Sequence, residues 1–125
     1  MTRPVVLTRD YETLVGWWKG FGQDSYAASE LPPCGFINDY AACFLLKTDG
    51  CACFLEHLVS DPTSADEERS IAIDDVVDAC LALAQSIGFR LVYAITSNKR
   101  VINRAITEHG FSVPREAFQI VTREL

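Results

Sequence analysis

Carboxylates crowd the segment VSDPTSADEERSIAIDDVV, residues 59–77, which leads from an apolar run into a stretch with helical apolar spacing. Junctions of this kind bind phosphates in many α/β proteins, because the first amides of a helix are unpaired and carry partial positive charge. A carboxylate at the same place repels a phosphate. This junction has one arginine, no glycine and six acids between positions 61 and 75, namely Asp61, Asp66, Glu67, Glu68, Asp74 and Asp75.

Two helix starts fit this segment. Ser64 and Glu67 have the spacing of a capping box, which would begin the helix near Ala65 and let its own acids stabilise the first turn. Alternatively, the helix begins at Ser70, so that residues 61–69 form a loop and the amides of Ser70 to Ile73 face an anion. The sequence leaves both starts open.

The composition predicts one globular domain, residues 1–125, because 49% hydrophobic residues suffice for a single core. The net charge of −6 argues against a nucleic-acid partner. Charged residues interrupt the longest apolar stretch, 41–59, and the N-terminus lacks a long apolar run, so we expect a cytoplasmic protein without a membrane association.

The cysteines are expected to be structural. Four of the five, Cys34, Cys43, Cys51 and Cys53, lie in runs that read as strands, where cysteine behaves as a small buried hydrophobe. No CxxC or paired-histidine spacing occurs, so we predict no metal site.

Hydrophobic periodicity predicts an α/β (α+β) fold with the order β-α-β-β-β-α-β-α-β. Strands with two apolar faces require helices on both sides of the sheet. The expected strands are 4–8, 34–39, two between 40 and 61, 89–96 and 116–124, and the expected helices are 10–22, the segment ending at 87, and 97–111.

A two-residue turn at Asp49-Gly50 would set the register of the central hairpin. Cys43 would then lie opposite Glu56, and strict alternation would place Glu56 and His57 on opposite faces of the sheet.

The order of elements resembles the GNAT superfamily of acyl-CoA-dependent N-acyltransferases over nearly the whole chain. The most specific part is GFRLVYAITSNKRVINRAITEHGF, residues 88–111, with Asn98 near a helix start and Gly110-Phe111 at its end. The stretch LPPCGFI, followed by a hairpin and SDP, is similar to small GNAT-like proteins encoded by tailed phages, which would place this protein in the host cytoplasm.

The resemblance implies acetyl-CoA as cofactor. In the family, the fourth strand pairs with pantetheine and the following helix receives the pyrophosphate at its N-terminus. The residues that correspond here are Leu58, Val59 and Ser60 on the strand, Arg69, Ser70, Ile71 and Ala72 near the helix start, and Asn98.

The resemblance also implies catalytic and substrate residues. Glu56 matches the place from which several GNAT enzymes direct a general base. Adjacent tryptophans point about 100° apart on a helix, so we expect one of Trp17 and Trp18 in the core and the other partly exposed, where it could line the acceptor cleft. His57 is a second candidate base, although a strand histidine is usually structural.

Two positions depart from the family pattern. Laying the pyrophosphate loop from Arg69 puts Ala72 and Asp74 where glycines are expected. Ile106 stands where the family often has a tyrosine as general acid, although a thiolate needs little help to leave.

The function implied is therefore transfer of an acetyl group from acetyl-CoA to a primary amine, on a small molecule or a lysine side chain. The alternative is a GNAT-fold protein that has lost catalysis and binds a protein partner. A homodimer is compatible with both.

Overall fold

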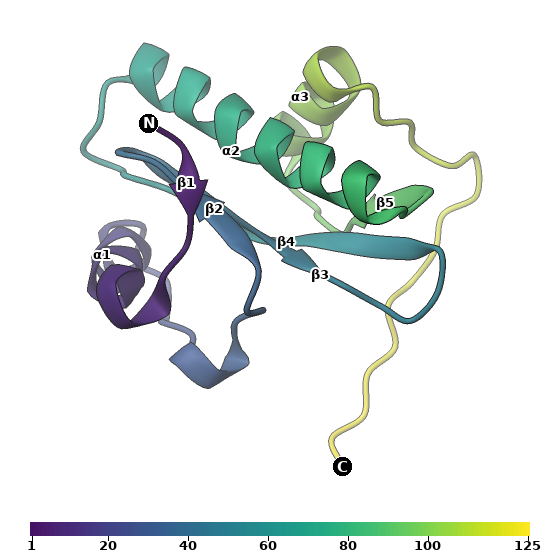
Figure 1. The fold of residues 1–125 in the computed structure, drawn as a ribbon. Coiled ribbons are helices and arrows are strands. Elements are labelled where there is room, and N and C mark those ends of the chain that lie inside the picture. The colour runs from purple at the N-terminus through teal and green to yellow at the C-terminus, as the bar shows by residue number, and fades with distance from the viewer. The chain divides into compact units, whose positions relative to one another are not determined.

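The structure, a computed structural model, describes residues 1–125 as two compact units, Met1–Ile95 and Thr96–Leu125. The first unit holds one five-stranded sheet in the order β1-β2-β3-β4-β5, with β4 and β5 parallel and the other neighbours antiparallel (Figure 1). Its elements are β1 (Arg3–Pro4), α1 (Leu7–Gly20), η1 (Ala28–Glu30), β2 (Gly35–Ile37), β3 (Ala41–Leu46), β4 (Ala52–Ser60), α2 (Asp66–Ile87) and β5 (Leu91–Ala94). The single-domain prediction stays a prediction.

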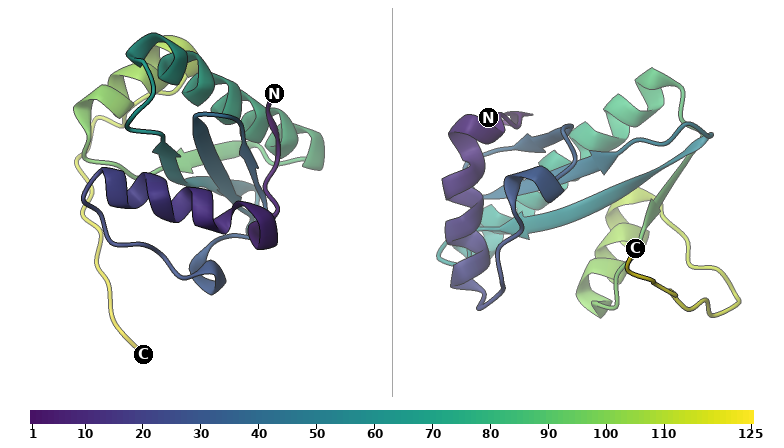
Figure 2. Two further views of the ribbon diagram at one scale, coloured as in Figure 1. Left: turned by 90° about the vertical axis from the view of Figure 1, so that its left-hand side faces the viewer. Right: turned by 90° about the horizontal axis from the view of Figure 1, so that it is seen from below.

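Helices cover both faces of the sheet, as predicted (Figure 2). On one face, α1 packs Leu14, Trp17 and Trp18 against strand residues that include Phe44 and Val59. On the other face, α2 packs against the opposite side of β3 and β4. That second layer contains Val76, Val77, Cys80, Ala84, Ala41, Cys43, Leu45 and Cys53. The sheet is therefore the middle layer of three in this unit.

The second unit contains α3 (Lys99–His109). Asn98 caps it, because its side-chain oxygen accepts hydrogen bonds from the amides of Arg100 (3.0 Å) and Val101 (3.3 Å). Gly110 ends the helix in the left-handed region, at φ 71°. The sequence left the cap open between Ser97 and Asn98, and the structure selects Asn98; the predicted end at Gly110 is confirmed.

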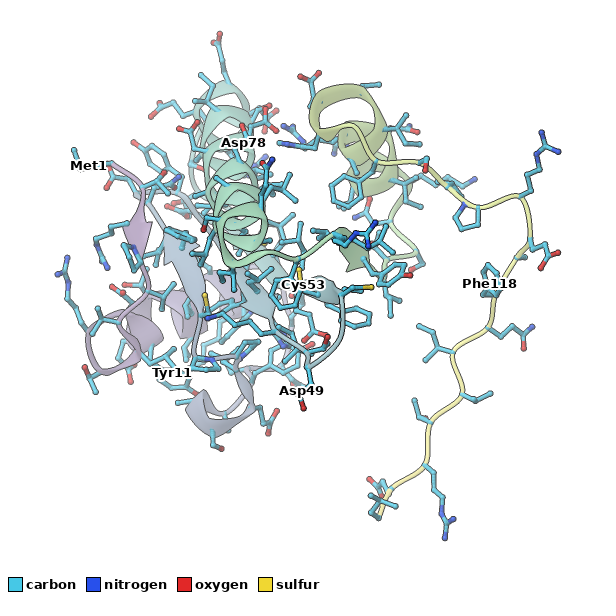
Figure 3. All side chains as sticks on the ribbon, turned by 45° about the vertical axis from the view of Figure 1, so that its right-hand side comes forward. Met1, Tyr11, Asp49, Cys53, Asp78 and Phe118 are labelled. Atoms are coloured by element: carbon cyan, nitrogen blue, oxygen red, sulfur yellow. The ribbon has the colours of Figure 1, made fainter.

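The predicted closing strand, 116–124, is wrong for this structure. Residues 112–125, which carry Phe118 in Figure 3, contain no helix or strand. Apolar alternation supplies one side-chain face, but a strand also needs backbone partners along its length, and alternation does not specify them.

The tip of the β3–β4 hairpin is wider than predicted. Leu46 lies opposite Phe54, and five residues, 47–51, connect the two strands at the tip, where Figure 3 shows Asp49. The Thr48 hydroxyl accepts from the Gly50 amide (3.1 Å) and donates to the Ala52 carbonyl. Phe44, rather than Cys43, therefore lies opposite Glu56.

A β-bulge interrupts β4 at His57. Ala42 pairs with Val59 and Phe44 pairs with Glu56, so two residues of β4 stand opposite Cys43 alone. His57 has φ 53° and is the one non-glycine residue with positive φ. Bulges of this kind bend a strand and redirect its side chains.

The N-terminal strand is shorter than predicted, because α1 already begins at Leu7. Asp10 is 4% exposed and accepts hydrogen bonds from the Val6 amide (2.8 Å) and from both terminal nitrogens of Arg3 (2.6 and 2.8 Å). These bonds satisfy an amide at the start of α1 and tie it to β1. The Arg3 guanidinium holds the pKa of Asp10 below its ordinary value.

Three cysteines, Cys43, Cys53 and Cys80, are buried in the core as thiols. The prediction that Cys51 is buried is wrong, because it lies exposed in the wider hairpin loop. No helix combines the length and the apolar character that crossing a bilayer would require.

Replacing Asp10 tests the tie between β1 and α1. Asp10→Asn should lower the free energy of unfolding by about 1–3 kcal/mol, because Arg3 loses its anionic partner. In the wild type the pKa of Asp10 is lower folded than unfolded, so the pair stabilises fully above about pH 4 and its contribution is lost as the pH falls further. Urea unfolding of the wild type and of Asp10→Asn at pH 7 and pH 3 measures the cost of the substitution and its pH dependence. An equal loss of unfolding free energy at the two pH values would contradict the Arg3–Asp10 pair as its cause.

Replacing His57 tests the bulge. His57→Val should be less stable than His57→Gly by about 1–2 kcal/mol, because a β-branched residue resists positive φ and glycine does not. Urea midpoints of the two variants give the comparison. A valine variant as stable as the glycine variant would mean that the backbone at this position is not constrained.

Candidate active site at the fork between β4 and β5

The strands β4 and β5 separate halfway along β4. Their pairing ends at Leu55 and Ala94, whereas β4 continues to Ser60. Residues 56–60 thus have no partner in β5, and their amides and carbonyls on that side can pair with an extended ligand. Three predicted cofactor residues, Leu58, Val59 and Ser60, lie on this free half; their contact with a cofactor stays a prediction.

Glu56 is the first residue of β4 beyond the last paired position. It lies opposite Phe44, which belongs to the α1-facing core, so its side chain projects from that face. The carboxylate is about one-third exposed. Glu56 therefore combines access to solvent with a position at the start of the fork, although its catalytic role stays a prediction.

The prediction that Glu56 and His57 point to opposite faces is wrong. The bulge breaks the alternation, and Nε2 of His57 lies 3.5 Å from Oε2 of Glu56. The His57 ring also contacts Phe44, with ring centroids 6.2 Å apart, on the α1-facing side. The two residues most capable of proton transfer in this region are therefore neighbours.

An aromatic residue that the sequence analysis did not select borders this pair. Tyr26 contacts the His57 ring edge-on, with centroids 4.4 Å apart, and contacts Trp18 at 5.4 Å. The Tyr11 hydroxyl donates a hydrogen bond to the Tyr26 carbonyl (2.7 Å), which holds the loop in place. Tyr26 lies between α1 and η1 in a segment without periodicity, so no pattern in the sequence indicates its position.

Both tryptophans of α1 are buried, Trp17 at 7% and Trp18 at 2% exposure. The prediction that one is partly exposed is wrong, because the buried stripe of a helix is wide enough for neighbours 100° apart. Their observed contacts are with the core, and contact with an acceptor stays a prediction. Tyr26, which contacts Trp18, is 42% exposed.

The junction between β4 and α2 is a tight turn organised by Asp61. Its carboxylate accepts from the Thr63 amide (2.9 Å) and hydroxyl (2.7 Å), and its carbonyl accepts from the Ser64 hydroxyl (2.7 Å). The Ser64 hydroxyl is thereby used, and α2 begins at Asp66 with no side-chain cap on Ala65. The predicted start of the helix near Ala65 is confirmed. The predicted capping box of Ser64 and Glu67 is wrong, and so is the alternative start at Ser70.

Because α2 begins at Asp66 and not at Ser70, a different set of backbone amides is open to an anion. Ser70, Ile71 and Ala72 lie beyond the first turn, where backbone amides bond within the helix, and the unpaired amides belong to residues 66–68. The Arg69 side chain pairs with the Asp66 carboxylate and approaches the Pro62 carbonyl at 3.5 Å. The residues present do not fit a pyrophosphate in the predicted way, and binding by residues 69–72 stays a prediction.

Asn98 belongs to the second unit, where its side chain caps α3. Its predicted part in cofactor binding stays a prediction. No group of three histidine, cysteine or acidic side chains in residues 1–125 is placed to hold a metal ion.

Comparison with known proteins rests on structure. No protein-family model matches the sequence, and no curated protein is significantly similar to it. A candidate acetyltransferase from Agrobacterium tumefaciens superposes with a TM-score of 0.70 at 13% identity, covering 98% of this chain and 99% of that one.

Two further structures agree. A GNAT-family acetyltransferase from Streptococcus pneumoniae matches with a TM-score of 0.65 at 10% identity, over 99% of this chain and 97% of that one. An aminoglycoside N-acetyltransferase solved in complex with CoA matches with a TM-score of 0.64 at 17% identity, over the full length of both chains. The chain therefore has the fold of the GNAT acetyltransferases.

Proposed function

We propose that the protein is an N-acetyltransferase that moves an acetyl group from acetyl-CoA to a primary amine. The observation that carries the proposal is the coincidence of Glu56, the bulge at His57 and the end of β4–β5 pairing at Leu55. One acid thus stands where a strand edge becomes available to a ligand. Positioning of a thioester and removal of a proton from the amine both accelerate acyl transfer, and these two features can supply them.

In the proposed reaction, the pantetheine arm lies along the free half of β4 and pairs with backbone groups of Leu58 to Ser60. Glu56, directly or through one water, removes a proton from the ammonium group of the acceptor. The amine nitrogen then attacks the thioester carbonyl and loses its second proton to solvent, the C–S bond breaks, and the CoA thiolate leaves and takes a proton from solvent. An amide of β4 near Leu58 stabilises the oxyanion.

The pyrophosphate is the weakest part of the fit. It would meet the amides of residues 66–68 and the carboxylates of the same turn, with Arg69 already paired to Asp66. We therefore propose that the strand edge contributes most of the cofactor's binding energy. A relative of the same fold was solved with CoA, which supports this class of cofactor.

The acceptor is proposed to be a cationic amine. The chain has a net charge of −6, and the one-third exposed Glu56 side chain and the Tyr26 ring both lie next to His57. A carboxylate and an aromatic ring both attract an ammonium group. Aminoglycosides, polyamines and lysine side chains share this chemistry.

A second candidate is a binding protein that retains the fold without catalysis. The carboxylates in the first turn of α2 favour it, because they oppose a phosphate, and so does Ile106 at the position of the family's tyrosine. Cytoplasmic location, phage origin and a homodimer stay predictions under either candidate.

Cofactor binding separates the two candidates. Acetyl-CoA at about 100 times its dissociation constant should raise the free energy of unfolding by about 2.7 kcal/mol, visible as a higher melting temperature. Thermal unfolding with millimolar acetyl-CoA measures this, with ATP at the same concentration as the control for unspecific nucleotide binding. An unchanged melting temperature would exclude the enzyme.

Replacing Glu56 tests the base. Glu56→Gln should lower kcat by about 10²–10⁴-fold, because the amide cannot accept the proton, while the acetyl-CoA-induced shift is kept. The rate of CoA release with an aminoglycoside, spermidine or an Nα-blocked lysine gives the measurement. Glu108→Gln, the same change at an exposed position of α3, is the matched control. A Glu56→Gln variant as fast as this control would remove Glu56 from the reaction.

A further inference from the structure

We infer that His57 is the proton acceptor behind Glu56, so that the two residues act as one base in acetyl transfer. This inference rests on the proposed function and assigns His57 a role through Glu56 rather than contact with a reactant. It therefore makes His57 a positioning and proton-relay residue.

The geometry of the bulge carries the inference. In a regular strand, neighbours point to opposite faces, so a glutamate and the next residue cannot meet. Here the left-handed backbone of His57 places Nε2 3.5 Å from Oε2 of Glu56. Positive φ is uncommon for a residue with a side chain, and such backbone strain gathers at functional sites. The structure maintains this conformation at the fork.

The ring of His57 is held by aromatic neighbours. Phe44 of β3 contacts it at 6.2 Å between centroids and Tyr26 at 4.4 Å, both edge-on, and 16% of the side chain is exposed. The titratable groups in contact with it are Glu56 of β4 and Tyr26 of the loop, while Phe44 is uncharged. The ring is therefore held in one orientation, with Nε2 toward the carboxylate.

The proton balance follows from this orientation. Glu56 takes one proton from the acceptor's ammonium group and passes it to Nε2 of a neutral His57, which becomes an imidazolium beside a carboxylate. The imidazolium then loses one proton to water, and exchange of the remaining ring proton with water restores the neutral tautomer in which Nε2 is unprotonated. The His57 side chain is 16% exposed, so water can reach the ring and take up the proton.

The experiment uses His57→Gly, because glycine accepts positive φ and preserves the bulge while removing the imidazole. His109→Gln is the control, since it removes the other histidine of the chain, which lies in the last turn of α3. The rate of CoA release is followed from pH 5.5 to 9 in the wild type and both variants. Imidazole is then added to each protein at increasing concentrations.

His57→Gly should lower kcat by about tenfold or more, less than the loss in Glu56→Gln. The pH at which kcat/KM rises should differ from that of the wild type in His57→Gly and should be unchanged in His109→Gln. Free imidazole should restore activity to His57→Gly alone, because a structural role of the ring would not respond to a diffusible base.

Two results would overturn the inference in distinguishable ways. If the wild type transfers acetyl and Glu56→Gln does not, but His57→Gly keeps the wild-type rate and pH profile, the relay is wrong and the proposed function stands. If the wild type binds no acetyl-CoA and acetylates none of the amines, the proposed function and the relay fail together.

Discussion

The β-bulge at His57 is the constraint on which the site depends. It shifts the pairing of β3 with β4 by one residue, so that the two strands are in different registers on either side of it. Val59 still faces the α1 core above the bulge, and Glu56 shares that face below it. The same irregularity places Glu56 and His57 together, just beyond the last position at which β4 pairs with β5. One backbone irregularity thus orients both Glu56 and His57 at the fork.

The three layers of the first unit hold this irregularity in place. Phe44, below 2% exposure, lies under the His57 ring, and α1 supports the Tyr26 loop through Trp18 and the Tyr11 hydroxyl. The Arg3–Asp10 pair in turn fixes the start of α1 against the edge of the sheet. Because interiors are close-packed, a strained backbone under such a layer has little room to relax.

The C-terminal half of β4 and the turn that follows it differ in what they can bind. The free edge of β4 suits an extended ligand, whereas the turn that follows uses Asp61 to bind its own Thr63 and Ser64. The first turn of α2 then places acids beside its unpaired amides, which satisfies the helix dipole from within. The free strand edge therefore suits an extended ligand, whereas the acids in the first turn of α2 oppose an anion.

The sequence by itself determined the order of most elements, the two apolar faces of the sheet, the C-terminal end of α2 and both ends of α3, because these depend on periodicity and on residues such as Gly88, Asn98 and Gly110. Only the tertiary structure decided the wider hairpin tip, the bulge and the unpaired edge of β4. Register depends on hydrogen bonds between distant residues, and a shift of one residue reverses every face. For that reason the sequence separated Glu56 from His57, and the packed sheet brought them together.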